Sequence, residues 1–261
     1  MITLDQVTVK RRGQAVLVNA SLQLRLGEVL AIVGPNGAGK STLMAAMAGD
    51  LAPSTGHVLL DGVALNAWTP LALARRRAVM PQAARLGFSL PVEQVVALGR
   101  APFERHYDRA QNQAAIRHAI AAADIQHLLR RGYATLSGGE QQRVQLARAV
   151  AQLDLLAAGQ AGPAPILMLD EPTASLDLSH AHGVLRLARQ LAGQGVAVAT
   201  VLHDLPLAYA YADRVAVLQS GRLLALDTPL KALTPENLAA AFAVDAALYD
   251  GHLVIKGPLA A

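Results

Sequence analysis

The chain has 261 residues, 53% of them hydrophobic, yet its longest stretch free of Asp, Glu, Lys and Arg, residues 155–169, is interrupted by glycines and prolines. It therefore falls short of the roughly 20 apolar residues that a membrane-spanning helix needs. The absence of cysteine excludes disulfides and thiolate metal sites, and the start of the sequence lacks the basic and apolar runs of a secretory signal. The formal net charge of +4 permits an anionic partner, although the run Arg75-Arg76-Arg77 predicts no more than a solvated helix face.

Strand-like runs alternate with turns in the first third of the chain, at residues 2–9, 15–26, 28–33 and 57–60. A glycine-rich loop follows the third run at residues 34–39, and residues 40–48 have the composition of a helix. Asp61 and Gly62 then predict a turn. We expect an antiparallel β portion at the N-terminus and a strand–loop–helix unit beside it.

Helical spacing replaces the strand-like runs from about residue 88 to residue 152, in the segments 92–98, 111–123 and 140–152. Short apolar runs at residues 166–169 and 196–202 predict buried strands, and residues 214–218 and 222–226 predict a hairpin. The fold class is therefore α/β, with a mostly parallel core sheet. We expect a single domain, in which residues 1–87 and 153–261 form the core and C-terminal tail and residues 88–152 form an inserted helical subdomain.

A loop in the second half of the chain and the C-terminal tail carry no motif with an assigned function. Residues 153–165 are rich in Ala, Gly and Pro and predict an exposed loop. Beyond about Thr228 the tail predicts a helix that begins at Pro235 and a short strand at Val254 and Ile255, to which no function is assigned.

The glycine-rich loop matches the phosphate-binding pattern in full, with the residues Gly34, Pro35, Asn36, Gly37, Ala38, Gly39, Lys40, Ser41 and Thr42. Its glycines let backbone N–H groups curl around phosphate oxygens, and the start of the following helix favours negative charge. Lys40 is expected to bridge the β- and γ-phosphates, and Ser41 to hold Mg²⁺. A plain glycine-rich turn is the alternative, but the apolar strand before the motif and the helix after it disfavour that interpretation.

An apolar run ends in two carboxylates at Asp170 and Glu171. Asp170, at the end of a buried strand, is expected to reach Mg²⁺ through water, and Glu171 to lie near an attacking water as general base. A strand end with two solvated carboxylates is common, so this pattern alone is weak evidence for catalysis. It becomes strong evidence because the same chain carries the phosphate loop.

The string Leu136-Ser137-Gly138-Gly139-Glu140-Gln141-Gln142-Arg143 places a hydroxyl and two glycines at the start of a helix, either as a second anion site or as a flexible turn with a Ser cap. It resembles the signature of the ATP-binding-cassette (ABC) ATPases. Other landmarks follow the order of that family: Gln82 is similar to its Q-loop glutamine, Asp177 in Ser175-Leu176-Asp177 to its D-loop, and His203 to its switch histidine.

This resemblance implies an ATPase with a RecA-like core that binds ATP and Mg²⁺ and works as a homodimer. The signature residues Ser137, Gly138, Gly139 and Glu140 of one subunit then act on the nucleotide held by Lys40 of the other. It also implies that His203 orients the γ-phosphate and water. Gln82 joins Ser41 and Asp170 at Mg²⁺ and links the site to the partner surface.

One position departs from the family pattern. The first strand usually ends near an aromatic residue that stacks on adenine, and here Arg12 occupies that place. A guanidinium plane can also stack on a base, whereas an ordinary surface arginine is the alternative.

Two segments bear on the cargo. Gly99-Arg100-Ala101-Pro102 resembles the ATPases of importers for iron-siderophores, haem and cobalamin, although Gly99 and Pro102 also fit a simple helix end. The long segment 153–165, with Asp177-Leu178-Ser179-His180 after the carboxylates, is similar to haemin-importer ATPases in particular.

We therefore expect the peripheral ATPase of a haemin importer at the cytoplasmic face of a bacterial inner membrane. Its homodimer is expected to dock on a membrane permease dimer fed by a periplasmic substrate-binding protein, with no nucleic acid partner. A siderophore or cobalamin importer is the first alternative and a soluble non-transport ABC ATPase the second. Without cysteines, sustained heptads or a second cassette, the chain offers little support for the second alternative.

Overall fold

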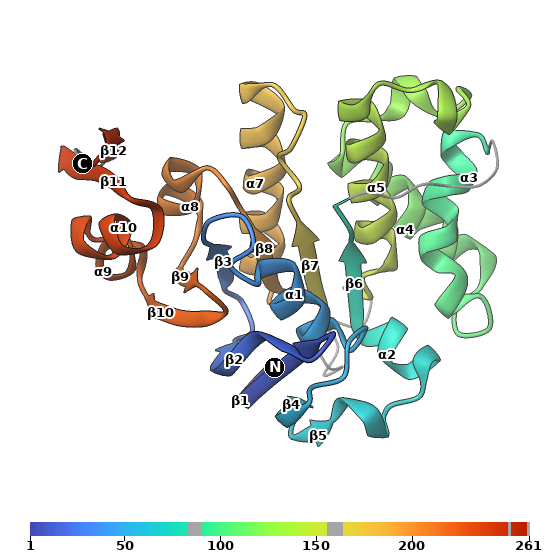
Figure 1. The fold of residues 1–261 in the computed structure, drawn as a ribbon. Coiled ribbons are helices and arrows are strands. Elements are labelled where there is room, and N and C mark those ends of the chain that lie inside the picture. The colour runs from blue at the N-terminus through green and yellow to red at the C-terminus, as the bar shows by residue number, and fades with distance from the viewer. Residues whose placement is uncertain (83–89, 156–163, 250–251, 260–261) are drawn as a thin grey trace. The chain divides into compact units, whose positions relative to one another are not determined.

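The computed structural model of the protein describes residues 1–82, 90–155, 164–249 and 252–259. The chain divides into two compact units, which are described separately below. The first unit comprises Met1–Trp68 and Ala197–Ala261, and the second comprises Thr69–Val196 (Figure 1). Among the described residues, no helix is long and apolar enough to cross a membrane.

The first unit contains a four-stranded antiparallel sheet in the order β2-β1-β4-β5. Its strands are β1 (Ile2–Arg11), β2 (Gln14–Leu24), β4 (Thr55–Leu60) and β5 (Val63–Ala64). Buried and exposed residues alternate along much of β1 and β2, as expected for strands with one solvated face. This sheet confirms the predicted antiparallel portion.

A second set of strands in this unit runs in the order β10-β9-β3-β8. It consists of β3 (Val29–Val33), β8 (Ala197–Val201), β9 (Arg214–Gln219) and β10 (Arg222–Asp227). β3 is parallel to both β8 and β9, and every residue of β3 and β8 is buried. The continuous apolar runs are thus explained by burial on both faces.

Helix α1 (Lys40–Ala48) follows β3 and contacts β1, β2 and β8 (Figure 1). Seven of its residues are buried, which is why its sequence is apolar on nearly all sides. The helix therefore exposes little besides the end at which the phosphate loop enters it.

The remaining elements of the first unit are η1 (Leu65–Ala67), α8 (Leu205–Tyr211), α9 (Pro229–Ala232), α10 (Pro235–Phe242), β11 (Val244–Tyr249) and β12 (His252–Pro258). The predicted tail helix begins at Pro235, as expected, and the two residues predicted as a strand lie in β12. β11 and β12 pair as an antiparallel hairpin, and β12 packs against α8.

The second unit combines a parallel strand pair, β6 (Arg77–Met80) and β7 (Ile166–Asp170), with several helices. The helices are α2 (Pro70–Arg76), α3 (Val92–Ala97), η2 (Leu98–Phe103), α4 (Arg109–Ala122), η3 (Gln126–Leu128), η4 (Tyr133–Thr135), α5 (Gly138–Gln152) and α7 (Leu178–Gly193). α5 packs against α3, η2 and α4, within the green part of Figure 1. The three predicted helical segments are thus confirmed.

The predicted solvated arginine face is wrong. Arg76 is buried and donates to the carbonyl of Ala164, and Arg75 donates its Nε–H to the carbonyl of Pro102 at 2.8 Å. Arg77 begins β6, a strand that the sequence analysis missed. Basic residues in this run therefore join segments of the second unit.

The predicted helix end at Gly99 is confirmed, since α3 ends at Ala97, but Gly99 is not a left-handed cap. α3 ends with Leu98 in a right-handed helical conformation, and Gly99 continues into η2. The predicted exposed loop at residues 153–165 lies mostly outside the described residues, but its described ends Leu153 and Pro165 are buried.

Candidate nucleotide site

The phosphate loop is shaped by glycines that no larger residue could replace. Gly34 lies so close to β9 that an added Cβ would be 2.4 Å from the carbonyl oxygen of Leu218. Gly39 has φ +101°, and a Cβ there would be 2.9 Å from the carbonyl oxygen of Val16. The loop thus follows a narrow path between β9 and β2 before it enters α1.

The start of α1 has no side-chain cap, because Gly39 occupies the cap position. Its first N–H groups therefore point toward the loop, an arrangement that attracts phosphate. Lys40 is buried, and its ammonium donates to the carbonyl of Gly34 at 2.7 Å and to that of Pro35 at 3.0 Å. These contacts hold the positive charge over the loop.

His203 lies on the same edge of the first unit as this loop. It comes two residues after the end of β8, and the phosphate loop follows β3, to which β8 is parallel. Asp204 caps α8 by accepting from the N–H of Leu207 at 2.9 Å, which fixes the chain just after the histidine. The side chain of His203 remains exposed.

Arg12 occupies the tip of the β1–β2 hairpin. Arg12 and Gly13 have φ of 50° and 81°, which are the positive values of a type I′ turn. From this tip β2 runs to Val16, whose carbonyl borders Gly39 of the phosphate loop. The exposed Arg12 is therefore four residues before Val16, the residue at which the β1–β2 hairpin lies against the phosphate loop.

The second unit brings Glu171 and Gln82 together. The Nε2 of Gln82 donates to Oε2 of Glu171 at 2.7 Å, and Nε2 of Gln142 donates to the backbone carbonyl of Glu171 at 3.2 Å. Glu171 has φ 53°, a conformation that non-glycine residues rarely adopt and that is found often at functional sites. The predicted catalytic carboxylate is thus held from both its side chain and its backbone.

Asp170 is the last residue of β7 and is half-buried. Its carboxylate and the amide oxygen of Gln82, both in the second unit, are oxygen donors of the kind that Mg²⁺ prefers. The hydroxyl of Ser41, in the first unit, is another donor of this kind. Among the described residues, no group of three or more His, Cys, Asp and Glu could hold a metal ion.

The signature string begins α5 with a capping box. Ser137 Oγ accepts from the N–H of Glu140 at 3.3 Å, and Glu140 Oε2 accepts from the N–H of Ser137 at 2.8 Å. Arg131 also donates to Glu140 at 2.9 Å. The hydrogen bond from the backbone of Ser137 is the main reason that the pKa of Glu140 is lowered.

Asp177 caps α7 beside the signature string. Its carboxylate accepts from the N–H of His180, contacts the His180 ring at 2.8 Å and accepts from the hydroxyl of Ser179 at 3.0 Å. The His180 backbone bond, followed by these side-chain bonds, holds the pKa of Asp177 at about 2. Asp177 is therefore an anion throughout the physiological range.

The signature string and the D-loop line one surface hollow of about 480 Å³ in the second unit. A Cβ added to Gly139 would be 3.1 Å from the carbonyl oxygen of Ser175, so the two segments are in close contact. The structure thus brings Ser137, Gly138, Gly139 and Asp177 to one surface.

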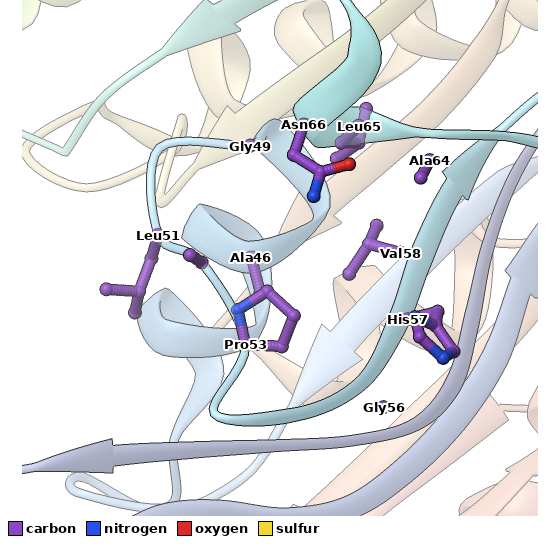
Figure 2. Close-up of a pocket in the computed structure, with 11 residues that line it drawn as sticks. Ala46, Gly49, Leu51, Pro53, Gly56, His57, Val58, Ala64, Leu65 and Asn66 are labelled. Atoms are coloured by element: carbon purple, nitrogen blue, oxygen red, sulfur yellow. The ribbon is translucent and has the colours of Figure 1, made fainter.

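Another hollow, of about 260 Å³, lies at the far end of α1 (Figure 2). Ala46, Pro53 and Val58 line it with small apolar groups, and Asn66 reaches over it from η1. Since the phosphate loop enters the opposite end of α1, this hollow is separate from the phosphate-binding chemistry.

Sequence reasoning assigned no role to Gln142, Arg131 or His180, each of which holds a candidate site residue. Gln142 lies five residues after Ser137 and reaches the carbonyl of Glu171. Nothing in the one-dimensional spacing could pair them, because α5 and β7 are distant in the sequence.

Comparisons with known proteins agree with these motifs. A family profile described as ABC transporter matches residues 17–174. The hemin import ATP-binding protein HmuV of Pseudomonas entomophila is 48% identical over 245 residues, covering 94% of this chain and 93% of that protein. The protein of the same name from Myxococcus xanthus is 52% identical over 225 residues, covering 85% of this chain and 82% of that protein.

Solved structures show the same fold. A dimeric bacterial ABC transporter cassette has a TM-score of 0.75 and 26% identity, covering 88% of this chain and 99% of that chain. A bacterial Atm1-family ABC exporter with ATP bound has a TM-score of 0.72 and 30% identity, covering 89% of this chain and 39% of that chain. With a complete phosphate loop, the signature string and these matches, the chain belongs to the ABC transporter family as an ATP-binding cassette.

Proposed function

We propose that this protein is the ATP-hydrolysing subunit that powers import of haemin through a separate membrane permease. The observation that carries the proposal is the identity of 45–52% to proteins named hemin import ATP-binding protein, over most of the chain. The phosphate loop, the Gln82–Glu171 contact and the signature string supply the parts that ATP hydrolysis needs. The predicted division into a core and an inserted helical subdomain, residues 88–152, belongs to the same proposal.

ATP binds at the phosphate loop in this proposal. The N–H groups between Gly34 and Thr42 accommodate phosphate oxygens, and Lys40 exchanges its contacts with loop carbonyls for the β- and γ-phosphates. Ser41, Asp170 and Gln82 are the residues proposed to hold Mg²⁺, which neutralises charge on the phosphates when bound. Arg12 stacks on adenine in place of an aromatic residue.

Glu171 accepts a proton from the attacking water as general base, and His203 orients that water and the γ-phosphate. The contact of Gln82 with Glu171 supports a further role for this glutamine, because it places the Q-loop amide on the base itself. A displacement of Gln82 by a partner protein therefore changes the position of the carboxylate.

A homodimer completes the site, with the signature hollow of one subunit covering the nucleotide of the other. The similarity to a dimeric cassette supports this arrangement. The open hollow lined by Ser137, Gly138 and Gly139 supports it too, since it presents a hydroxyl and helix N–H groups at the surface. In this proposal the homodimer is a peripheral protein at the cytoplasmic face of the inner membrane, where it docks on a permease dimer fed by a periplasmic binding protein.

Reconstitution tests the cargo. The subunit is co-expressed with the permease of its own import system, purified in complex and placed in liposomes, and ATP-driven uptake of haemin, ferric siderophore and cobalamin is compared. We expect haemin uptake from the wild-type complex and none from the Glu171→Gln complex, which serves as the matched control. Uptake of only a siderophore or cobalamin would contradict the cargo, and failure to associate with any membrane protein would favour a soluble ABC ATPase.

A further inference from the structure

Gly99 and Arg100 belong to the segment that resembles metal-chelate importers. In the second unit they form a close contact between η2 and the end of α5, which we call the joint. A Cβ added to Gly99 would lie 2.3 Å from the carbonyl oxygen of Arg148 and 3.1 Å from Cβ of Ala151. The backbone of η2 therefore touches the last turns of α5 directly, and only glycine permits that approach.

Arg100 then binds the end of α5. Its Nη1 donates to the carbonyls of Ala151 at 3.0 Å and Leu153 at 3.5 Å, groups that a helix terminus leaves without partners in the helix. Its Nε donates to Oδ1 of Asn112 on α4 at 2.9 Å. One side chain thus joins η2, α4 and the C-terminal end of α5.

Arg100 is 3% exposed, and the central carbon of its guanidinium lies 4.1 Å from the centre of the Phe103 ring. Burial lowers the pKa of Arg100, and the nearby Asp154 opposes this effect. Tyr107 donates to Asp154 at 2.8 Å beside it. Burying a charge is costly unless it is well bonded, so the position of this cation is set by the carbonyls it binds.

Two further hydrogen bonds extend the joint to the strand that leads to Gln82. Gln152, at the end of α5, donates to the carbonyls of Ala74 at 2.9 Å and Arg77 at 3.0 Å, on either side of the α2–β6 boundary. Arg75 on α2 donates to the carbonyl of Pro102 in η2. The segments α2–β6, η2 and α5 therefore meet at one set of buried and half-buried contacts.

We propose that Arg100 is a positioning residue that makes the η2 surface and the signature helix α5 move as one body, and so couples the permease to ATP hydrolysis. This inference rests on the proposed transport function. The surface of the joint carries exposed apolar side chains, Leu98 on η2 at 44% and Leu71 on α2 at 52%. α5 is about 22 Å long for its 15 residues, and Ser137 caps its opposite end. A displacement at η2 thus reaches the signature hydroxyl through a rigid helix.

The decisive measurement is the number of haemin molecules imported per ATP hydrolysed by the reconstituted complex. We compare wild type with Arg100→Met and Arg100→Lys, and use Arg117→Met on the exposed face of α4 as the matched control. Lysine keeps the charge but cannot bond Asn112 and the α5 carbonyls at once with one planar fork. We expect at least a threefold lower ratio in both Arg100 variants, an unchanged KM for ATP, and wild-type values in the control.

A merely structural role of Arg100 gives a different result. Loss of folding lowers the amount of active complex, but it leaves the number of haemin molecules imported per ATP unchanged. An unchanged ratio in Arg100→Lys would therefore overturn the proposal. If Arg100→Met does not fold, Arg75→Met replaces it, because the half-buried Arg75 belongs to the same joint. An unchanged number of haemin molecules per ATP in both Arg100→Lys and Arg75→Met then overturns the proposal as well.

The proposed function can fail independently of the joint. A wild-type complex that imports none of the three cargoes contradicts the transport proposal. In that case the ratio of ATPase activity with the permease to ATPase activity without it decides the positioning role, because the amount of folded protein does not change this ratio. A lower ratio in Arg100→Lys than in wild type supports the role, and an unchanged ratio contradicts it.

Discussion

Gly99→Ala tests the close contact between η2 and α5. The added Cβ would lie 2.3 Å from the carbonyl oxygen of Arg148, whereas carbon and oxygen atoms normally approach to about 3.3 Å, so η2 must retreat by about 1 Å. That retreat stretches the 3.0 Å hydrogen bond from Arg100 to Ala151 beyond its useful range. Overpacking of this kind costs about 1–3 kcal/mol, and we expect the melting temperature to fall by about 2–4 °C for each kcal/mol.

Gly183→Ala is the matched control, because Gly183 lies inside α7 and no atom lies within 4 Å of an added Cβ. The same substitution should there stabilise the protein by about 0.5–1 kcal/mol through helix propensity. Urea and thermal unfolding of both variants, followed by circular dichroism, measure the two changes in stability. We expect Gly99→Ala to be less stable than wild type and Gly183→Ala to be more stable. Equal stabilisation by both substitutions would refute the close contact at Gly99.

Four further predictions concern the candidate site. Lys40→Ala should abolish binding of a fluorescent ATP analogue, whereas the exposed Lys10→Ala should bind it normally. Glu171→Gln should bind ATP, hydrolyse it at least 100-fold more slowly and elute as a dimer in gel filtration, so hydrolysis at the wild-type rate contradicts the base role. Arg12→Ala should raise the Kd for ATP about two- to fivefold, in line with the ~0.5–1 kcal/mol of an exposed cation–π contact, and an unchanged Kd contradicts stacking. Asp177 has its pKa held at about 2 rather than 3.8, so its charge stabilises the fold above pH 4 and ceases to do so as the pH falls through 2. Urea midpoints of wild type and Asp177→Asn should therefore converge as the pH falls from 4 to 2, and a constant difference contradicts this.

Motifs that depend on local chain geometry were predictable from the sequence. The phosphate loop needs glycines at fixed offsets and a helix directly after it, and α1 begins and ends where the composition places it. The capping box of Ser137 and Glu140 is likewise a contact over three residues. Such features are encoded within a few neighbouring positions, so spacing suffices to find them.

Contacts between distant segments were not predictable in the same way. The arginine run looked like a solvated face, because charge is usually exposed, yet Arg76 is buried on a carbonyl 88 residues away. Gly99 looked like a helix cap, because glycine commonly ends helices, yet it serves a close approach to α5. In both cases the partner is a backbone carbonyl, which carries no signature in the sequence.

The uncapped start of α1 has a consequence for the lifetime of the protein. Since most of this helix is buried and its uncapped start faces the phosphate loop, bound nucleotide adds its binding energy to the stability of the unit around it. At a concentration 100 times the Kd, that linkage amounts to about 2.7 kcal/mol. A subunit with ATP is thus expected to withstand proteolysis that removes one without it, so that the nucleotide supply itself adjusts how many subunits persist.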